Sequence, residues 1–387
     1  MTDLEHILPL WRELEASGAD YVLATVVAVE GPSYRKPGAR MLLANDGRRA
    51  GTVSGGCLEA EVARRAWWLT ESGPVVERYS TAEDDGDMPY GSGCGGVVYL
   101  LLERRATAAP LLTALEEAFH QRAPLAIASV LEGPFMCQRT ITGPSQLRAT
   151  TDRLNAVSAR SVPALEDLSE LAFSRKKSFD EKVLIGGIPT RVFGDYRAAR
   201  PGLWIFGAGD DAKPLTNLAR QLGWFVAVAD GRSHLATNNR FSLANDVMVI
   251  PIADLPDSAD ALFSTRMLPS DAAVLMTHSF EQDSRVLAAI LGDPRIFPLA
   301  YLGVLGPQRR TRELLVEAAR LLHLSVPPDR AEQWLAQLHA PTGLDLGAET
   351  PATIALSIVA EIQQTLAAAT AHPLREVRAV KIEVAQP

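Results

Sequence analysis

Hydrophobic positions in residues 1–105 switch between helical spacing and unbroken runs. From Leu4 to Leu14 they recur every three or four residues, which predicts an amphipathic helix even though Pro9 lies inside it. A second stretch at helical spacing runs from Val62 to Leu69. Apolar runs predict strands at 21–30, 40–44, 51–53, 75–79 and 97–103. The first 105 residues therefore predict a mixed α+β N-terminal domain.

Residues 106–200 show the weakest pattern of the chain. A helix is predicted at 108–118 and a strand at 126–131, whereas 149–180 is expected to form loop or short helices. Proline and glycine in GDYRAARPG, residues 194–202, indicate a boundary at the end of this region. We interpret residues 106–200 as an intervening subdomain with a linker.

From Leu203 onward, apolar runs alternate regularly with stretches at helical spacing. Strands are predicted at 203–206, 224–230, 246–250, 273–277 and 299–304, and helices at 215–222, 283–291 and 310–322. This alternation is typical of a doubly wound parallel sheet. The chain is therefore expected to be an α/β protein in which residues 201–345 form a Rossmann-like domain.

Residues 346–387 are expected to form a C-terminal helix and tail. Thr350 and Pro351 suit the cap and first turn of a helix that continues to Leu366. Apolar residues recur along it at helical spacing, which suits either packing against the core or the face of a homodimer. Core packing is the more common outcome, and the homodimer stays as the alternative.

Composition narrows the class of protein. Hydrophobic residues make up 47% and charged residues 22% of the 387, the balance of a globular protein with a large core. With 38 lysine and arginine against 46 aspartate and glutamate, the net charge of −8 argues against nucleic acid as a partner. No apolar run approaches the roughly 20 residues needed for a membrane span, and the acidic start differs from a secretory signal.

Three cysteines, Cys57, Cys94 and Cys137, are too few and odd in number for a disulfide framework, so a reducing, cytoplasmic setting is expected. Cys137 is interpreted as a small buried hydrophobe. Cys57 and Cys94 lie in glycine-rich loops that open the backbone, which favours a functional role. The chain contains no CxxC motif and no pair of histidines at ligand spacing, which argues against a zinc site.

The two cysteine loops differ in their surroundings. Cys57 follows Gly55 and Gly56 and falls at or near the N-terminus of the second helix, where unpaired N–H groups and the helix dipole favour a thiolate. Acidic residues at positions 59 and 61 oppose that effect. Cys94 is followed by Gly95 and a strand, and the acidic run before it, residues 83–87, is interpreted as a solvated loop.

A glycine-rich turn opens the C-terminal domain. Gly207 and Gly209 follow the first strand of this domain, and Ala212 stands where a third glycine is common. Gly207 permits the tight turn and Gly209 the close approach of a phosphate, which would meet the N–H groups of a helix N-terminus. The pattern predicts a dinucleotide-type site. The alternative is a Rossmann-type fold that has lost its nucleotide.

An acidic residue, Asp230, ends the second strand of this domain, 21 positions after Gly209. In dinucleotide sites such a residue bonds a ribose hydroxyl, and Arg232 could pair with a phosphate. Asp230 could instead cap the turn that follows it. We favour the ligand role.

Eight motifs together give the chain a specific resemblance. They are PGARM (37–41), GTVSGGCLEAEV (51–62), GCGG (93–96), IFGAGDDAKPL (205–215), ADGR (229–232), MTHSFEQD (276–283), YLGVLGPQRR (301–310) and PTGLDLGAETPATIALSI (341–358). This set resembles the XdhC and CoxI family, the accessory factors of xanthine dehydrogenase and related molybdenum hydroxylases. The resemblance covers nearly the whole chain outside the middle region.

The resemblance implies a chaperone that binds molybdenum cofactor, supports its sulfuration with a cysteine desulfurase and delivers it to an apo molybdenum hydroxylase. Cys57 and Cys94 would contact molybdenum or sulfur. Asp210 occupies a position that is often histidine in the family, and Ser92 one that is often apolar. The expected cofactor-binding residues are Gly55, Gly56, Cys57, Cys94, Gly95, Gly207, Gly209, Asp210, Ala212, Asp230 and Arg232.

The cofactor implied by the resemblance also suits the chemistry of the candidate residues. Molybdopterin, or its dinucleotide form, carries a soft metal end that thiolates suit and a phosphate end that a glycine-rich helix N-terminus suits. Two alternatives stay open. One is an NAD(P)-dependent oxidoreductase that uses the Rossmann-like domain, and the other is a redox sensor in which Cys57 and Cys94 form a reversible pair.

Overall fold

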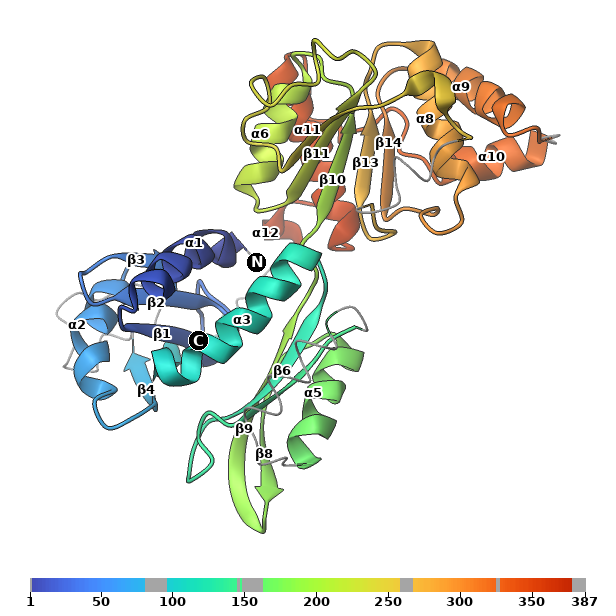
Figure 1. Ribbon diagram of the computed structural model, residues 1–387. Coiled ribbons are helices and arrows are strands. Elements are labelled where there is room, and N and C mark those ends of the chain that lie inside the picture. Colours follow the sequence, from blue (N-terminus) through green and yellow to red (C-terminus); the bar gives the residue numbers. More distant parts are fainter. Residues whose placement is uncertain are drawn as a thin grey trace, which may run out of the picture. The chain divides into compact units, whose positions relative to one another are not determined.

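The computed structural model describes residues 2–80, 96–144, 147, 163–257, 267–324 and 328–377 (Figure 1). The chain divides into two compact units, residues 1–200 and residues 201–387. Each unit buries hydrophobic clusters of its own. The four-part division predicted from the sequence is finer than this one and stays a prediction.

A five-stranded antiparallel sheet, which we call the N-terminal sheet, lies in the first unit. Its order is β3-β2-β1-β5-β4, from β1 (Tyr21–Glu30), β2 (Arg40–Ala44), β3 (Arg49–Gly51), β4 (Val75–Ser80) and β5 (Val97–Arg104). Because successive strand residues point to opposite faces, one face shares a core with α2 (Glu59–Leu69). The other face packs with α1 (Thr2–Ser17) and α3 (Arg105–Gln121). The helices and the other four strands predicted for residues 1–105 are confirmed, whereas the strand predicted at 51–53 lies earlier, at Arg49–Gly51.

Strand directions bring several connections to one end of the N-terminal sheet. β1, β3 and β4 run in the same direction, and β2 and β5 run against them. The carboxyl ends of β1, β3 and β4 and the amino ends of β2 and β5 therefore lie at the same end of the sheet. We call it the loop end.

A four-stranded antiparallel sheet occupies the region with the weakest sequence pattern. Its order is β7-β6-β9-β8, from β6 (Leu125–Val130), β7 (Arg139–Thr142), β8 (Phe179–Ile185) and β9 (Ile188–Arg197). The strand predicted at 126–131 is confirmed. The loop or short helices expected at 149–180 are wrong for α5 (Pro163–Arg175), one continuous helix. It buries Leu165, Leu168 and Ala172 at helical spacing, a short stripe that the charged residues around it obscure in the sequence.

The second unit is built on a parallel sheet in the order β12-β11-β10-β13-β14. Its strands are β10 (Gly202–Phe206), β11 (Phe225–Asp230), β12 (Asp246–Val249), β13 (Ala272–Leu275) and β14 (Tyr301–Val304). One face packs with α6 (Ala212–Gln221) and α11 (Pro351–Leu366), and the other with α8 (Phe280–Gly292), α9 (Gln308–Leu321) and α10 (Pro328–Ala336) (Figure 1). The predicted Rossmann-like sheet is confirmed. A 3₁₀ turn (Ile252–Asp254) and the short α12 (Leu374–Val377) complete the described elements.

The helix α11 packs into the core of the second unit. Ala355, Ile358 and Ile362 are buried in one cluster with residues of α6 and the sheet. The Thr350 side chain accepts a hydrogen bond from the backbone of Thr353, and a proline occupies the first turn, as predicted. Core packing is therefore confirmed, and the homodimer stays a prediction. Within the described residues, no helix is both long enough and apolar enough to cross a bilayer.

Candidate functional site

Cys57 lies in the connection between β3 and α2, at the loop end of the N-terminal sheet. The residue before it, Gly56, has a φ of +115°, a conformation that residues with a side chain rarely adopt. The helix begins two residues after Cys57, and the Cys57 side chain is exposed. The predicted position of Cys57 just before a helix is thus confirmed. The contacts of Gly55, Gly56 and Cys57 with a cofactor stay predictions.

Glu59, the first residue of α2, holds this connection in place. It is 4% exposed, and its carboxylate accepts the backbone N–H groups of Val53 (3.1 Å), Ser54 (2.9 Å) and Gly56 (3.0 Å). It also accepts the hydroxyl groups of Ser54 (2.5 Å) and Thr52. Burial acts to raise the pKa of Glu59, but these hydrogen bonds outweigh it and lower the pKa to about 2. Glu59 is therefore a charged anchor for the turn.

Ser54 links this anchor to the thiol. Its hydroxyl donates to Glu59 and accepts the backbone N–H of Leu58 (3.0 Å) and Gly56 (3.3 Å). The Sγ of Cys57 lies 3.6 Å from Ser54 Oγ, within hydrogen-bonding distance for sulfur. A chain of polar contacts thus runs from the exposed thiol through Ser54 to the buried carboxylate. The sequence did not predict that Ser54 and Glu59 hold the turn in place, although both residues lie in the GTVSGGCLEAEV motif.

A neighbouring loop, residues 31–38, lies against the connection that carries Cys57, residues 52–58, which we call the cysteine loop. The Arg35 guanidinium donates from Nε to the carbonyl oxygen of Thr52 at 3.1 Å. Further along the sheet, a Cβ added to Gly96 would overlap the carbonyl oxygen of Pro32, so only glycine fits there. Cys94 and Gly95, which precede Gly96, lie outside the described residues.

The second described cysteine differs from Cys57 in its surroundings. Cys137 is buried beside Val27, Leu101 and Phe193, so its interpretation as a small buried hydrophobe is confirmed. Burial raises the pKa of its thiol well above the ordinary range. In the part of the chain that the structure describes, no three His, Cys, Asp or Glu side chains are grouped as metal ligands.

The glycine-rich turn lies at the carboxyl end of β10 in the second unit, where such sheets bind ligands. Gly207 has a φ of +132°, and a Cβ added to it would lie 2.5 Å from the carbonyl oxygen of Met276. This steric limit confirms that the turn needs glycine at position 207. Ala212 is fully buried in the first turn of α6, where a larger side chain would not fit without movement of its neighbours.

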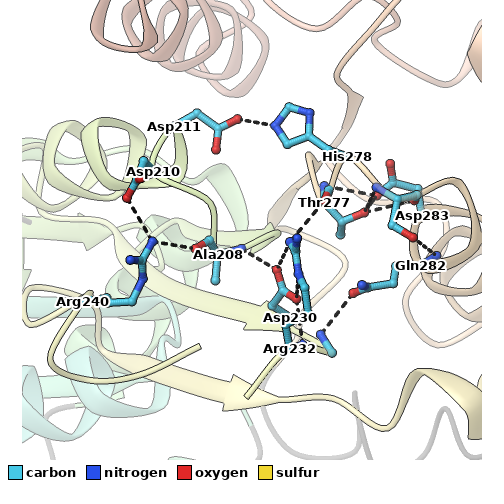
Figure 2. A network of polar contacts seen from close by, with 12 residues as sticks. Ala208, Asp210, Asp211, Asp230, Arg232, Arg240, Thr277, His278, Gln282 and Asp283 are labelled. Atoms are coloured by element: carbon cyan, nitrogen blue, oxygen red, sulfur yellow. Dashed lines mark hydrogen bonds and ion pairs between the residues drawn. The ribbon is translucent and has the colours of Figure 1, made fainter. Parts of the chain in front are cut away.

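Asp230 is fully buried at the end of β11, and its carboxylate is completely engaged (Figure 2). Oδ2 accepts the backbone N–H of Ala208 (2.8 Å) and the Arg232 guanidinium (2.7 Å). Oδ1 accepts the backbone N–H and the Nε of Arg232, each at 2.9 Å. Burial acts to raise the pKa of Asp230, but these contacts lower it. These contacts are the ones expected if Asp230 caps the turn that follows it. The ligand roles of Asp230 and Arg232 stay predictions.

A polar network extends from Arg232 to the neighbouring helices (Figure 2). Arg232 donates to the carbonyl oxygen of Thr277 at 3.2 Å, and the Thr277 hydroxyl donates to Asp283 at 2.7 Å. Asp283 is buried and also accepts from Arg310 at 2.7 Å. The network joins β11, the segment after β13 and the N-terminal turns of α8 and α9. Sequence analysis missed Thr277, Asp283 and Arg310 as a group because they come from two separate motifs.

Asp210 and Asp211 follow Gly209 in the glycine-rich turn, Asp210 beside Arg240 and Asp211 beside His278 (Figure 2). Asp210 is exposed and pairs with Lys213 (2.8 Å) and Arg240 (3.0 Å). The hydrogen bond from Lys213, followed by the contacts of Arg240, lowers the Asp210 pKa. Asp211 contacts Nε2 of His278 at 2.8 Å. A histidine therefore lies beside this turn, from the segment after β13. The predicted roles of Gly209, Asp210 and Ala212 toward a cofactor are untested.

Comparisons with known proteins give consistent matches over the two units. Residues 14–80 match the model of the XdhC and CoxI family, and residues 203–362 match the XdhC Rossmann domain. A protein of Bacillus subtilis (strain 168), named as a probable subunit of xanthine dehydrogenase, is 30% identical over 346 residues, 89% of this chain and 92% of that protein. The molybdenum cofactor insertion chaperone PaoD of Escherichia coli (strain K12) is 27% identical over 369 residues, 93% and 88% of the two chains.

A solved structure resembles the whole chain. The crystal structure of a xanthine dehydrogenase from Bacillus halodurans superposes with a TM-score of 0.67 at 26% sequence identity. The match covers 97% of this chain and 100% of that one. The similarity therefore includes both units rather than the Rossmann-like sheet alone.

Proposed function

We propose that this chain, which belongs to the XdhC and CoxI family, binds molybdenum cofactor and inserts it into an apo molybdenum hydroxylase of the xanthine dehydrogenase type. In this role the protein is a chaperone and need not turn over a substrate. The similar proteins of B. subtilis and E. coli support the proposal through their names. The observation that carries it is the exposed Cys57 thiol on a turn held by Glu59 and Ser54.

The chemistry of the described residues fits the two ends of such a cofactor. Molybdenum and sulfur are soft partners for a thiolate, and Cys57 presents a thiol that the fold leaves open to solvent. A phosphate is a hard anion that suits the N-terminus of α6. Because Ala208 already donates its N–H to Asp230, the phosphate would use N–H groups later in the turn. We expect Cys57 and Cys94 at the metal end and Gly207 to Ala212 at the phosphate end.

The finer steps of this function also belong to the proposal. The cofactor's terminal sulfido ligand would be installed while the cofactor is held, with a cysteine desulfurase as the sulfur donor. Molybdopterin and its dinucleotide form both carry the phosphate that the glycine-rich turn suits. The cytoplasm is the place where we expect this transfer to occur, since a reduced Cys57 thiol is needed for it.

The direct test is co-expression with an apo molybdenum hydroxylase, followed by metal and pterin analysis of the purified chain. Wild-type protein is expected to copurify with molybdenum and pterin and to activate the hydroxylase. Cys57→Ser and Cys94→Ser should lose most of both activities, because serine is a harder and weaker ligand for a soft metal. Cys137→Ala is the matched control, since its buried thiol should not contact the cofactor. Normal binding and activation by both serine variants would refute the metal half of the proposal.

A second candidate is an NAD(P)-dependent oxidoreductase. The observation that favours it is the glycine-rich turn at the carboxyl end of a parallel sheet. An enzyme of this class would bind NADH saturably and transfer hydride. The buried Asp230 carboxylate, with four hydrogen bonds, argues against the ribose contact that this class uses. Titration with NADH separates the two functions, because a chaperone would show no hydride transfer.

A further inference from the structure

Tyr34 presents an aromatic ring to solvent beside the cysteine loop. It is 76% exposed, the largest fraction among the large hydrophobic side chains that the structure describes. A Cβ added to Gly55 would lie 3.5 Å from Cγ and Cδ2 of this ring, in van der Waals contact. The ring therefore borders the first glycine of the Cys57 turn.

The loop that carries Tyr34 is fixed on both sides. Arg35 donates to the Thr52 carbonyl oxygen at 3.1 Å and pairs with Asp3 of α1. The Ser33 hydroxyl donates to the carbonyl oxygen of Arg35 at 2.9 Å, and Gly38 donates its N–H to the carbonyl oxygen of Val26 at 2.8 Å. The exposure of Tyr34 thus belongs to an anchored loop.

The stretch of the turn between the Tyr34 ring and Cys57 has no side chain of its own. The two intervening residues are Gly55 and Gly56, and a Cβ on Gly56 would meet no described atom within 4 Å. The Tyr34 ring thus lies at Gly55, and the exposed Cys57 thiol follows two residues later along the turn. A flat ligand with a sulfur or metal group would suit this arrangement, with its ring at Tyr34 and its sulfur or metal group at Cys57.

We propose that Tyr34 contacts the ligand directly, its ring stacking on the planar heterocycle of the bound cofactor while Cys57 takes the sulfur or metal end. The inference rests on the proposed function, which makes the heterocycle a pterin. Aromatic rings stack on such heterocycles with little regard to their substituents, and tyrosine loses few degrees of freedom on contact. Tyr34 would therefore add affinity and orient the cofactor relative to the thiol.

The test compares equilibrium binding of molybdenum cofactor, released from a purified molybdoenzyme, to wild-type protein and to three variants of Tyr34. Tyr34→Leu and Tyr34→Ala should weaken binding about 5- to 150-fold, the usual range for loss of one stacked ring. Tyr34→Phe should bind like wild type, because the ring and not the hydroxyl makes the contact. Trp68→Ala is the matched control, since Trp68 is 69% exposed near the far end of α2.

The outcomes separate this inference from the function on which it rests. If wild-type protein does not bind the cofactor, the proposed function fails. If wild type binds and Tyr34→Leu binds within twofold of it, Tyr34 has no ligand role and the inference is overturned. Competition by pterin-6-carboxylate but not by adenosine monophosphate would identify the stacked ring as the pterin. Competition by adenosine monophosphate but not by pterin-6-carboxylate would overturn that assignment in favour of a nucleobase.

Discussion

Glu59 shows how a buried charge can organise an exposed functional group. Its carboxylate accepts three backbone N–H groups and two hydroxyl groups of residues 52–56. In sequence terms, an acidic residue after Cys57 suggests only repulsion of a thiolate. In the structure its carboxylate accepts three backbone N–H groups of the strand-to-helix turn, and the Ser54 hydroxyl accepts the N–H of Gly56 and of Leu58.

Replacement of Glu59 by glutamine should destabilise the first unit by about 1–3 kcal/mol, since a neutral amide cannot accept all five hydrogen bonds and buried donors lose their partner. Urea unfolding followed by circular dichroism measures the change. Glu61→Gln is the matched control on the same helix, because Glu61 forms only surface pairs with Arg64 and Arg65. Equal unfolding midpoints for the two variants would contradict the role of Glu59 as an anchor.

The lowered pKa of Glu59 also predicts a pH dependence. A carboxyl with an ordinary pKa of roughly 4.3 in the unfolded chain and about 2 in the folded one contributes about 3 kcal/mol at neutral pH. This contribution is complete above pH 5 and is lost as the pH falls toward 2, because protonation then favours the unfolded chain. The stability difference between wild type and Glu59→Gln should therefore shrink over this interval. A difference that is constant from pH 6 to pH 3 would show that the carboxylate is not responsible.

Among the elements, the ion pair between buried Asp283 and partly exposed Arg310 ties the first turn of α8 to that of α9. Asp283 is 1% exposed and also accepts the hydroxyl of Thr277, so one carboxylate holds three segments at the carboxyl end of the parallel sheet. This arrangement fixes the neighbourhood of Arg232 through the carbonyl oxygen of Thr277.

Asp283→Ala should destabilise the second unit by about 1–3 kcal/mol, because the buried Thr277 hydroxyl loses its acceptor and the partly exposed Arg310 guanidinium loses its carboxylate. Thermal unfolding of the purified variant measures the loss. Glu313→Ala is the control on α9, where an exposed pair with Arg309 contributes at most about 0.5 kcal/mol. If both variants unfold at the temperature of wild type, the pair does not join the two helices.

The sequence pattern predicted those elements that bury a continuous apolar face. β10, β11 and β13 are buried almost throughout and read as apolar runs, so the parallel sheet was accessible from periodicity. β8 is mostly exposed along FDEKVLI, and its pairing with β9 depends on a partner that the pattern does not indicate. The cysteine and glycine positions were found from local motifs. The roles of Glu59 and Asp283 were not, because they depend on which distant atoms the fold brings within hydrogen-bonding distance.

At the scale of the whole molecule, the chain consists of two units with separate cores. The hydrophobic clusters described for residues 1–200 include no residue of the second unit, and those described for residues 201–387 include none of the first. The cysteine loop and the glycine-rich turn therefore belong to parts of the chain with cores of their own.

Fragments 1–200 and 201–387 should each fold and unfold cooperatively when expressed alone, since each retains its complete core. Circular dichroism and a single thermal transition for each fragment are the measurements. Fragment 201–387 should retain the hydrogen-exchange protection of β10 and β13, which lie inside the parallel sheet. A fragment that stays unfolded alone and folds only with the other half would show that the cores depend on each other.

The strand directions of the N-terminal sheet have a practical consequence for handling the protein. The turn between β2 and β3, Asn45 to Gly47, is exposed and lies at the end of the sheet opposite the loop end. A short peptide tag inserted there would attach the protein to a sensor surface at the end of the N-terminal sheet opposite Tyr34 and Cys57. The antiparallel pairing of β2 and β3 thus separates the attachment point from the proposed cofactor contacts on a single sheet.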